Sequence, residues 1–467
     1  MLTILELRCQ ERSGDNDSEL TRSGYQPMAS DKFRYPTLTA VVVANMIGTG
    51  VFTSLGFQLL DIRSGFVILM LWAVGGIAAL CGALCYAELG STLPRSGGEY
   101  NFLSRIIHPC AGFVSGWVSC TVGFAGPMAL ASMTFAAYAG SIFPGGIGPW
   151  EEKLLAATLL IGLTVVHSTS HRTSGNTQML FTALKVVIIL LFIFATLLVV
   201  DAPQPVNFLP IAGDGELMLS ATFAVSLIYV SFAFSGWNAA TYLSGELEDP
   251  QRTLPWILVV GTCVVTVLYL GLNFSFLYAA PIESMAGQIE VGAIAAQEAF
   301  GAVAGRFTGI ILALLLISTV SAMTIAGPRV IQVIGEDFPV FRAFGRTNSN
   351  DVPARAIFAQ SAVALVFIFS STFESVLVFS GFTLALNTFV TVLGVFILRY
   401  REPELDRPFK ITFYPIPMLV YLLLIGWTLV FTLLNRPIEG LLSLALIGSG
   451  LAFFGLNRFL QSQHSQG

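Results

Sequence analysis

Residues 44–52 read ANMIGTGVF, and residues 234–237 read FSGW. Each stretch lies near the middle of a long apolar window, at residues 36–60 and 219–243. Glycine costs about 1 kcal/mol inside a helix, and a broken helix in a bilayer is tolerated only where its backbone is buried or lines a cavity. We therefore predict that both windows form interrupted helices. The alternative is that these glycines only allow neighbouring helices to pack closely.

The composition places the chain in a membrane. Hydrophobic residues make up 55% of the 467 positions and charged residues 11%, whereas soluble domains have about 25% charged residues. A spanning helix needs roughly 20 apolar residues. The sequence predicts an all-α integral membrane protein with twelve transmembrane helices, in windows near 36–60, 65–90, 108–142, 153–170, 176–200, 219–243, 254–280, 305–332, 354–373, 375–399, 413–434 and 438–459.

The basic residues predict the orientation. Twelve spans place both termini on one side, and residues 1–35 form a polar segment that we expect to be a disordered cytoplasmic tail. Outside the distal tail and Lys185, fifteen of nineteen basic residues lie on the cytoplasmic side if the N-terminus is cytoplasmic. This bias fits the positive-inside rule, so we predict a multi-pass protein of the plasma (inner) membrane with both termini in the cytoplasm.

The two interrupted windows occupy matching places. Each opens a block of five windows, residues 36–200 and 219–399, and residues 413–460 hold the last two. Glycine-interrupted spans at corresponding positions of two halves are typical of inverted-repeat transporters, whose substrate site lies between the broken helices. A break exposes N–H groups on one side and carbonyl groups on the other. The N–H groups of Thr49 and Gly50 suit a carboxylate, and carbonyl oxygens suit an ammonium at Met46, Phe232, Ala233 and Ser235.

Five segments in order resemble those of a known family: ANMIGTGVF (44–52), YAELGSTLPRSGGEY (86–100), FAFSGWNAATYLSGELEDPQRTLP (232–255), AMTIAGPRV (322–330) and REPELDRPFK (401–410). The chain resembles amino acid permeases of the amino acid/polyamine/organocation superfamily, nearest the L-type amino acid transporter branch. The resemblance implies a LeuT-type fold with a 5+5 inverted repeat, broken helices 1 and 6, and peripheral helices 11 and 12.

The resemblance also implies a substrate site. Its first part is the span-1 motif, Met46, Ile47, Gly48, Thr49 and Gly50. Its second part is an aromatic gate at Phe232 and the unwound stretch formed by Ala233, Phe234, Ser235 and Gly236. The alternative for Phe232 is an ordinary core or lipid-facing aromatic residue, one of 37 phenylalanines.

Lys185 is the one basic residue well inside a window, and a charge at that depth is a functional hypothesis by default. In several relatives a lysine at this place fills the space of a sodium ion. We therefore expect Lys185 to reach the backbone near residues 46–49 and the hydroxyl groups of Ser318 or Thr319, which implies sodium-independent transport. A desolvated amine also favours its neutral form, which leaves a proton-linked cycle open. The remaining alternative is snorkelling to the cytoplasmic face.

The acidic residues favour neutral substrates. Glu88 and Glu99 flank the loop between the second and third windows, and no acid stands clearly in mid-membrane. We expect no cofactor and no metal. No histidine or cysteine near Cys81 and Cys85 completes a metal site. His167 and His171 are spaced i,i+4 and could bind a metal, but such pairs are more often loop or interface histidines. Some relatives pair through a cysteine in the loop between spans 3 and 4. That loop, SIFPGGIGPWEEK, has none, so we expect no disulfide-linked glycoprotein partner.

These features predict a secondary transporter of amino acids that works by alternating access through exchange or proton-linked symport. We expect its substrates to be neutral L-amino acids. The alternative is a transporter-like amino acid sensor without net transport. An intramembrane enzyme is the weakest interpretation, since paired catalytic groups at membrane depth are missing from the sequence.

Overall fold

The computed structural model describes residues 39, 42–43, 45–95, 97–143, 145–169, 175–242, 249–338, 341–350 and 352–464. The predicted tail, residues 1–35, lies outside them. The described part contains helices and loops but no strand. Its helices are α3 (Thr49–Asp61), α4 (Gly65–Thr92), α5 (Glu99–Ile106), α6 (Pro109–Val118), the π-helix η2 (Ser119–Gly123), α7 (Ala125–Gly140), α8 (Pro149–Thr169), α9 (Gly175–Val199), α10 (Asp214–Met218), α11 (Ala221–Phe234), α12 (Ala239–Tyr242), α13 (Pro250–Ala279), α14 (Ile282–Met285), α15 (Val291–Phe300), α16 (Ala302–Asp337), α17 (Ala354–Ser370), α18 (Phe373–Arg401), α19 (Ile416–Asn435) and α20 (Pro437–His464).

Each of the twelve predicted windows contains at least one of these helices. Within the described residues, nine helical segments are long and apolar enough to cross a bilayer. The other three windows hold the shorter helices α3, α11 and α17. The all-helical membrane architecture is therefore confirmed, while the count of twelve spans stays a prediction.

Local signals in the sequence define where several helices begin. The hydroxyl groups of Ser64, Ser220 and Thr372 accept hydrogen bonds from the backbone N–H groups of Val67, Phe223 and Ser375. Each bond satisfies a donor at a helix start that has no partner within the helix. Pro109 begins α6, where its missing N–H costs nothing.

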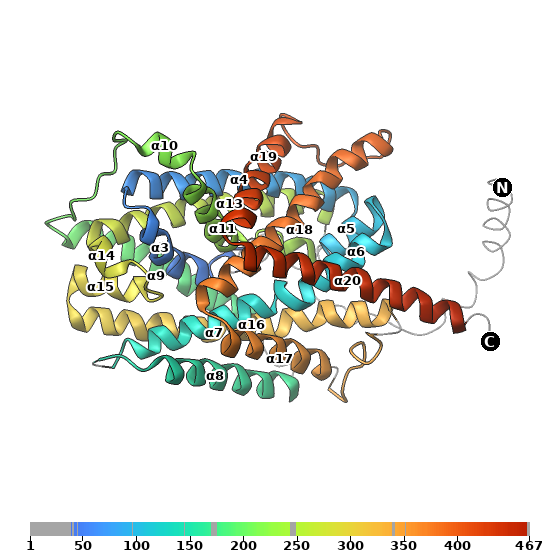
Figure 1. Cartoon of the computed structure of the whole chain (residues 1–467), viewed down its shortest axis with the longest axis horizontal. Coiled ribbons are helices and arrows are strands. Elements are labelled where there is room, and N and C mark those ends of the chain that lie inside the picture. Colours follow the sequence, from blue (N-terminus) through green and yellow to red (C-terminus); the bar gives the residue numbers. More distant parts are fainter. Residues whose placement is uncertain are drawn as a thin grey trace. The chain divides into compact units, whose positions relative to one another are not determined.

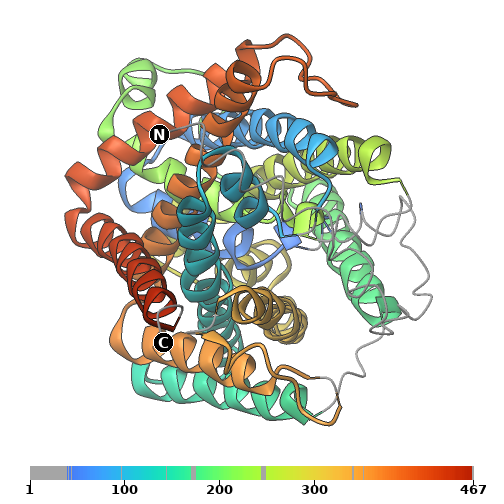
Figure 2. The same cartoon turned by 90° about the vertical axis from the view of Figure 1, so that its right-hand side faces the viewer.

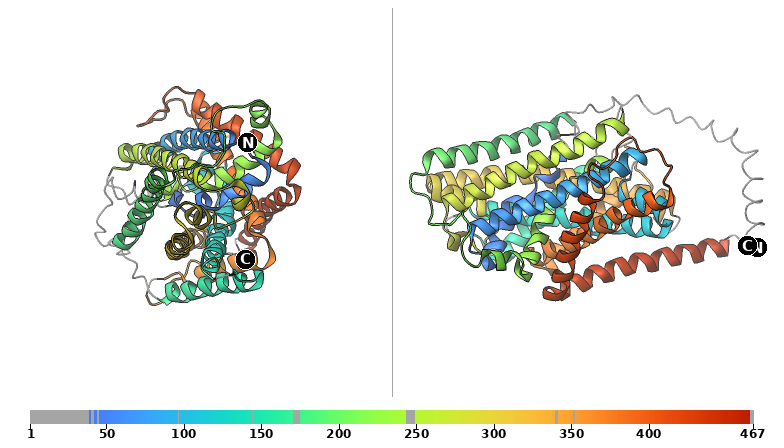
Figure 3. Two further views of the ribbon diagram at one scale, coloured as in Figure 1. Left: turned by 90° about the vertical axis from the view of Figure 1, so that its left-hand side faces the viewer. Right: turned by 90° about the horizontal axis from the view of Figure 1, so that it is seen from above.

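The long helices run side by side (Figure 1) and are seen nearly end-on in Figure 2 and in the left panel of Figure 3. Helix α4 packs along α13, and α7 packs along α16. In the right panel of Figure 3, α20 follows one edge of the helices and α9 the opposite edge. Only 17% of the apolar window in α20 and 22% of that in α9 is buried, against 61% in residues 109–140. Most residues of these two windows are therefore not buried within the protein, as lipid contact requires.

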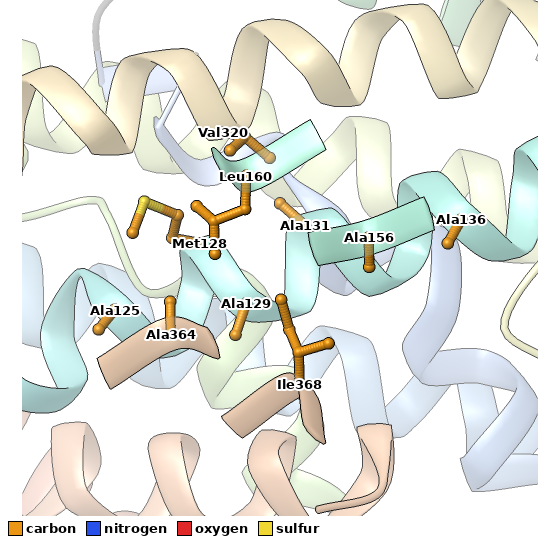
Figure 4. Close-up of a cluster of buried hydrophobic side chains, with 10 residues drawn as sticks. All are labelled: Ala125, Met128, Ala129, Ala131, Ala136, Ala156, Leu160, Val320, Ala364 and Ile368. Carbon is orange, nitrogen blue, oxygen red and sulfur yellow. The ribbon is translucent and has the colours of Figure 1, made fainter. Parts of the chain in front are cut away.

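A core of small side chains surrounds α7. Its alanines, among them Ala125, Ala129 and Ala136, contact Ala156 on α8 and Ala364 on α17. The close-up in Figure 4 shows these side chains between the ribbons, together with Met128, Ala131, Leu160, Val320 and Ile368. Small residues let helix backbones approach closely where lipid provides no hydrophobic driving force. This packing joins α7, α8, α16 and α17 into one framework beside the site described below.

Candidate functional site

Two helices are interrupted where the sequence predicted. Residues 45 and 46 are helical, residues 47 and 48 bend, and α3 begins at Thr49 with Gly48 as its N-cap. Helix α11 ends at Phe234, an irregular turn follows at residues 235–238, and α12 begins at Ala239. The Gly48 N–H folds back on the Met46 carbonyl oxygen at 2.8 Å. No side chain caps the start of α3, so its first N–H groups are available to a ligand.

The two breaks cross in direct contact. A Cβ atom on Gly50 would lie 2.5 Å from Ala233 Cα, and one on Gly236 would lie 2.8 Å from the Asn45 carbonyl oxygen. Gly236 also has φ +126°, which favours glycine. Both positions therefore require glycine. In addition, the buried Tyr269 hydroxyl on α13 lies within hydrogen-bond reach of the carbonyl oxygens of Met46 and Ala233, so one side chain ties both breaks together.

A cavity of about 140 Å³ lies at this crossing. Nine of the ten residues predicted to bind substrate line it: Met46, Gly48, Thr49, Gly50, Phe232, Ala233, Phe234, Ser235 and Gly236. The tenth, Ile47, is fully buried and does not line it. Thr319 lines the cavity, whereas Ser318 does not. The cavity therefore combines the start of one helix with the end of another, which is the backbone arrangement that suits a zwitterion.

Some of the carbonyl oxygens expected for an ammonium already accept bonds. Those of Met46 and Ala233 accept from Tyr269, and that of Phe232 accepts from the Ser235 N–H at 2.9 Å. The Met46 carbonyl oxygen also accepts the Gly48 N–H, so both of its lone pairs are engaged. The Ala233 and Phe232 carbonyl oxygens each have a second lone pair, and a ligand ammonium would add to their contacts rather than replace them.

Lys185 on α9 is 4% exposed and points to the first break. Its Nζ donates to the Ile47 carbonyl oxygen at 3.2 Å and to Thr319 Oγ1 on α16 at 2.8 Å. The Ser318 Oγ is buried and makes no hydrogen bond within the described part of the chain. The amine thus links α9, the first break and α16. Of the two hydroxyl groups expected near it, only Thr319 makes the contact.

Phe232 separates the cavity from an apolar cluster. It is 5% exposed and packs with Leu130, Tyr229 and Leu377. Beyond it, Phe57 on α3 stacks with Tyr229 at 6.3 Å and with Phe373 at 5.6 Å between ring centroids. This apolar cluster joins α3, α11 and the start of α18 on one side of the cavity.

Glu99 was not among the predicted site residues. Its sequence position flanks the loop between the second and third windows, yet it is 1% exposed and lines the cavity. Its Oε1 accepts hydrogen bonds from the Tyr86 hydroxyl at 2.9 Å and from the Asn238 side-chain amide. The preceding glycines, Gly97 at φ +116° and Gly98 at φ +52°, turn the chain inward. That glycine pair, directly before an acid and an amphipathic helix, was the available signal.

The π-helix η2 was also not predictable from the sequence. This π-helix interrupts the third window, and its Ser119 and Gly123 line the cavity. π-bulges within helices occur often at functional sites. No glycine or proline pattern marked it beforehand, since Gly123 resembles the packing glycines of the same window.

Unlike Glu99, Glu88 lies outside the cavity, in a cluster of ion pairs. Both of its oxygens bind the Arg399 side chain, at 2.7 and 2.5 Å, and Oε2 also accepts the Ile411 N–H at 2.8 Å. Arg407 Nε lies 3.7 Å from Oε1. Glu88 does not line the cavity. Its contacts hold the segment after α18 against the end of α4.

The described residues contain no group of three or more histidine, cysteine, aspartate or glutamate side chains that could hold a metal. His171 lies outside them, and His167 bonds to Ser321 Oγ at 2.8 Å. Cys81 and Cys85 are buried free thiols.

Comparison with known proteins gives the family. The family model for amino acid permeases matches residues 33–447. The chain is 29% identical over 388 residues to b(0,+)-type amino acid transporter 1 of Mus musculus, covering 82% of this chain and 78% of that protein. It is 30% identical over 420 residues to large neutral amino acids transporter small subunit 2 of Homo sapiens, covering 85% of this chain and 75% of that protein. The chain is therefore a member of the amino acid permease family, and it resembles the L-type amino acid transporter branch.

Proposed function

We propose that this chain is a secondary transporter that carries neutral L-amino acids across the plasma membrane by alternating access. The observation that carries the proposal is the cavity at the crossing of the two broken helices, with Thr49, Gly50, Ala233 and Ser235 in its wall. The relatives' names support transport rather than an enzymatic reaction.

The substrate's backbone groups are recognised by the protein's backbone. The α-carboxylate takes the N–H groups of Thr49 and Gly50, where the dipole of α3 favours negative charge. The α-ammonium takes the second lone pairs of the Ala233 and Phe232 carbonyl oxygens at the end of α11. An L-amino acid of any uncharged side chain satisfies this pattern.

The preference for neutral side chains follows from the wall of the cavity. Among the described residues that line it, Glu99 is the only aspartate, glutamate, lysine, arginine or histidine, and its carboxylate already binds Tyr86 and Asn238. The remaining wall includes apolar side chains such as Ala78, Met323 and Ile425. A substrate with a charged side chain would lose hydration without gaining a free counter-charge.

Transport proceeds by rocking of the broken-helix bundle against the framework around α7. We propose twelve spans, with residues 36–200 and 219–399 as inverted repeats, residues 413–460 as peripheral helices and both termini in the cytoplasm. Phe232 gates the site, since it lies between the cavity and the apolar cluster around Tyr229 and Phe57.

Lys185 couples the transport cycle to the framework helices, because it joins the first broken helix to α16. Its ammonium binds one carbonyl and one hydroxyl oxygen, and oxygen atoms of these kinds are also ligands of hard cations. We propose that it occupies the place of a sodium ion, which makes transport sodium-independent. The cycle is then exchange or proton-linked symport.

A covalent partner is not expected at the loop between α7 and α8, because residues 141–148 contain no cysteine. One relative is named a small subunit, so that protein works within an assembly. A partner of this chain would bind without a disulfide at this loop. We expect the protein to migrate at the same position on a denaturing gel with and without reductant.

The proposal is tested by uptake of labelled neutral amino acids into proteoliposomes, with and without internal amino acid, sodium and a proton gradient. Uptake that depends on internal amino acid identifies an exchanger, and uptake that follows the proton gradient identifies a symporter. Strict sodium dependence would contradict the role of Lys185. Binding without uptake would refute transport and support a sensor.

A further inference from the structure

Glu99 is a buried acid that takes part in neither the proposed substrate contacts nor the proposed coupling contacts. It is the first residue of α5, it is 1% exposed, and it lines one end of the cavity. Its Oε1 already has two donors within the protein, the Tyr86 hydroxyl and the Asn238 side-chain amide. Its role follows from the elements that its carboxylate joins.

The carboxylate joins two separate elements to α5. Tyr86 comes from α4, and Asn238 ends the turn that follows α11. The Tyr86 ring also packs edge-on against Trp237, with 4.6 Å between ring centroids. The turn is thus anchored twice at neighbouring residues, once through Asn238 and once through Trp237.

Among the described residues, two backbone N–H groups of the turn 235–238 donate to α11. Ser235 N–H donates to the Phe232 carbonyl oxygen, and Trp237 N–H donates to that of Phe234 at 3.4 Å. Between them Gly236 has a positive φ, a conformation that glycine loses entropy to adopt. The position of the turn therefore depends on anchors at its ends. Tyr269 holds the beginning, through the Ala233 carbonyl oxygen, and Glu99 holds the end.

We propose that Glu99 is a positioning residue of the transport cycle: through Asn238 it holds the turn 235–238 against α5, and this contact closes the α5 end of the cavity. The inference rests on the proposed transport function. Opening of that end requires the turn and α5 to separate, so the bond forms in one half of the cycle and is released in the other.

A carboxylate suits this task. A charged acceptor binds neutral donors more strongly than an amide oxygen does, and the first turn of α5 favours negative charge. Replacing Glu99 by alanine removes the acceptor and leaves buried donors on Tyr86 and Asn238, whereas glutamine keeps an acceptor oxygen without the charge. The two variants therefore separate loss of the contact from loss of its charge.

The experiment compares Glu99→Ala, Glu99→Gln, Asn238→Ala and the double variant Glu99→Ala/Asn238→Ala. The apparent KM for a labelled neutral amino acid is measured in whole cells and in inside-out membrane vesicles from the same cells. In the proposed topology α5 faces the cytoplasm. Loss of the contact lowers the population that is open to the outside, so the external KM rises about tenfold and the KM at the cytoplasmic face does not rise.

The double variant distinguishes positioning from separate roles. If Glu99 acts through Asn238, both alanine variants and the double variant raise the external KM by a similar factor, and Glu99→Gln recovers part of the loss. Glu283→Gln is the control, because Glu283 is exposed and pairs only with the exposed Arg63 among the described residues. It should match the wild type.

An equal rise of KM at both faces, or multiplicative effects in the double variant, would overturn the inference. So would a Glu99→Ala variant with wild-type kinetics. If that variant does not fold, the decision rests on Glu99→Gln and Asn238→Ala, whose external KM must rise while the cytoplasmic KM does not. Failure of the wild type to transport any amino acid would instead refute the proposed function.

Discussion

The ammonium group of Lys185 lies 3.2 Å from the carbonyl oxygen of Ile47, at the point where the first broken helix is interrupted. The same group bonds to Thr319 on α16. The substrate cavity and the framework are thus joined by one buried side chain that the proposed substrate does not touch.

Replacement of Lys185 by alanine should abolish most transport. The Ile47 carbonyl oxygen and the Thr319 hydroxyl both lose a charged donor, which costs about 1.5–3 kcal/mol for each bond. We expect uptake in proteoliposomes to fall at least about tenfold. Lys410→Ala, at an exposed residue outside the cavity, is the control. Wild-type uptake in the alanine variant would remove Lys185 from the mechanism.

Gly50→Ala should disrupt the crossing of the two breaks. The new Cβ would lie 2.5 Å from Ala233 Cα and 2.6 Å from Ala233 Cβ, so backbone must shift. We expect loss of amino acid binding, measured by scintillation proximity on purified protein. Gly162→Ala on α8 is the matched control, since nothing lies within 4 Å of its Cβ. A Gly50→Ala variant that binds normally would show that the crossing is not the substrate site.

Phe232→Ala should slow turnover more than it weakens binding. The ring separates the cavity from the apolar cluster around Tyr229, and its removal leaves the closed state with a space that water can enter. We expect the maximal uptake rate to fall by about tenfold or more while affinity changes less. The reason is that truncating a large core side chain costs about 3–5 kcal/mol, and this cost falls on the closed state, in which the ring is packed. Phe194→Ala, at a residue 59% exposed on α9, controls for loss of an aromatic ring. Unchanged turnover would contradict the gating role.

Glu88→Gln should lower stability without altering the cavity. Glu88 and Arg407 have side chains 3% and 7% exposed, and Arg399 is 23% exposed. Removal of one partner from a buried pair costs about 3 kcal/mol. A fall in Tm of the purified protein in detergent is the expected result. Glu283→Gln removes an exposed pair with Arg63 and should shift Tm little, because such pairs contribute about 0–1 kcal/mol. Equal shifts in the two variants would refute this distinction.

Much of the fold was predictable because the bilayer imposes it. Apolar length defined the windows, and each of them contains a helix. The breaks at Gly48 and Gly236 were predictable because glycine in mid-window has a cost that only a cavity or close packing explains.

The rest depends on contacts between distant parts of the chain. Glu99 flanks a loop in the sequence, and the inward turn at Gly97 and Gly98 brings it to the cavity. The π-helix at Ser119–Gly123 has no local signature. Ser318 and Thr319 are adjacent and equivalent in sequence, and the rotation of α16 alone decides that Thr319 meets Lys185.

The most direct test of the central claim is the accessibility of position 235. Ser235→Cys is introduced into a protein whose six native cysteines have been replaced, and a membrane-impermeant thiol reagent is applied to each side of the membrane separately. We predict modification from both sides, and slower modification from both sides when a transported neutral amino acid is present. Modification from one side only, or a rate that the amino acid does not change, would contradict alternating access through this cavity.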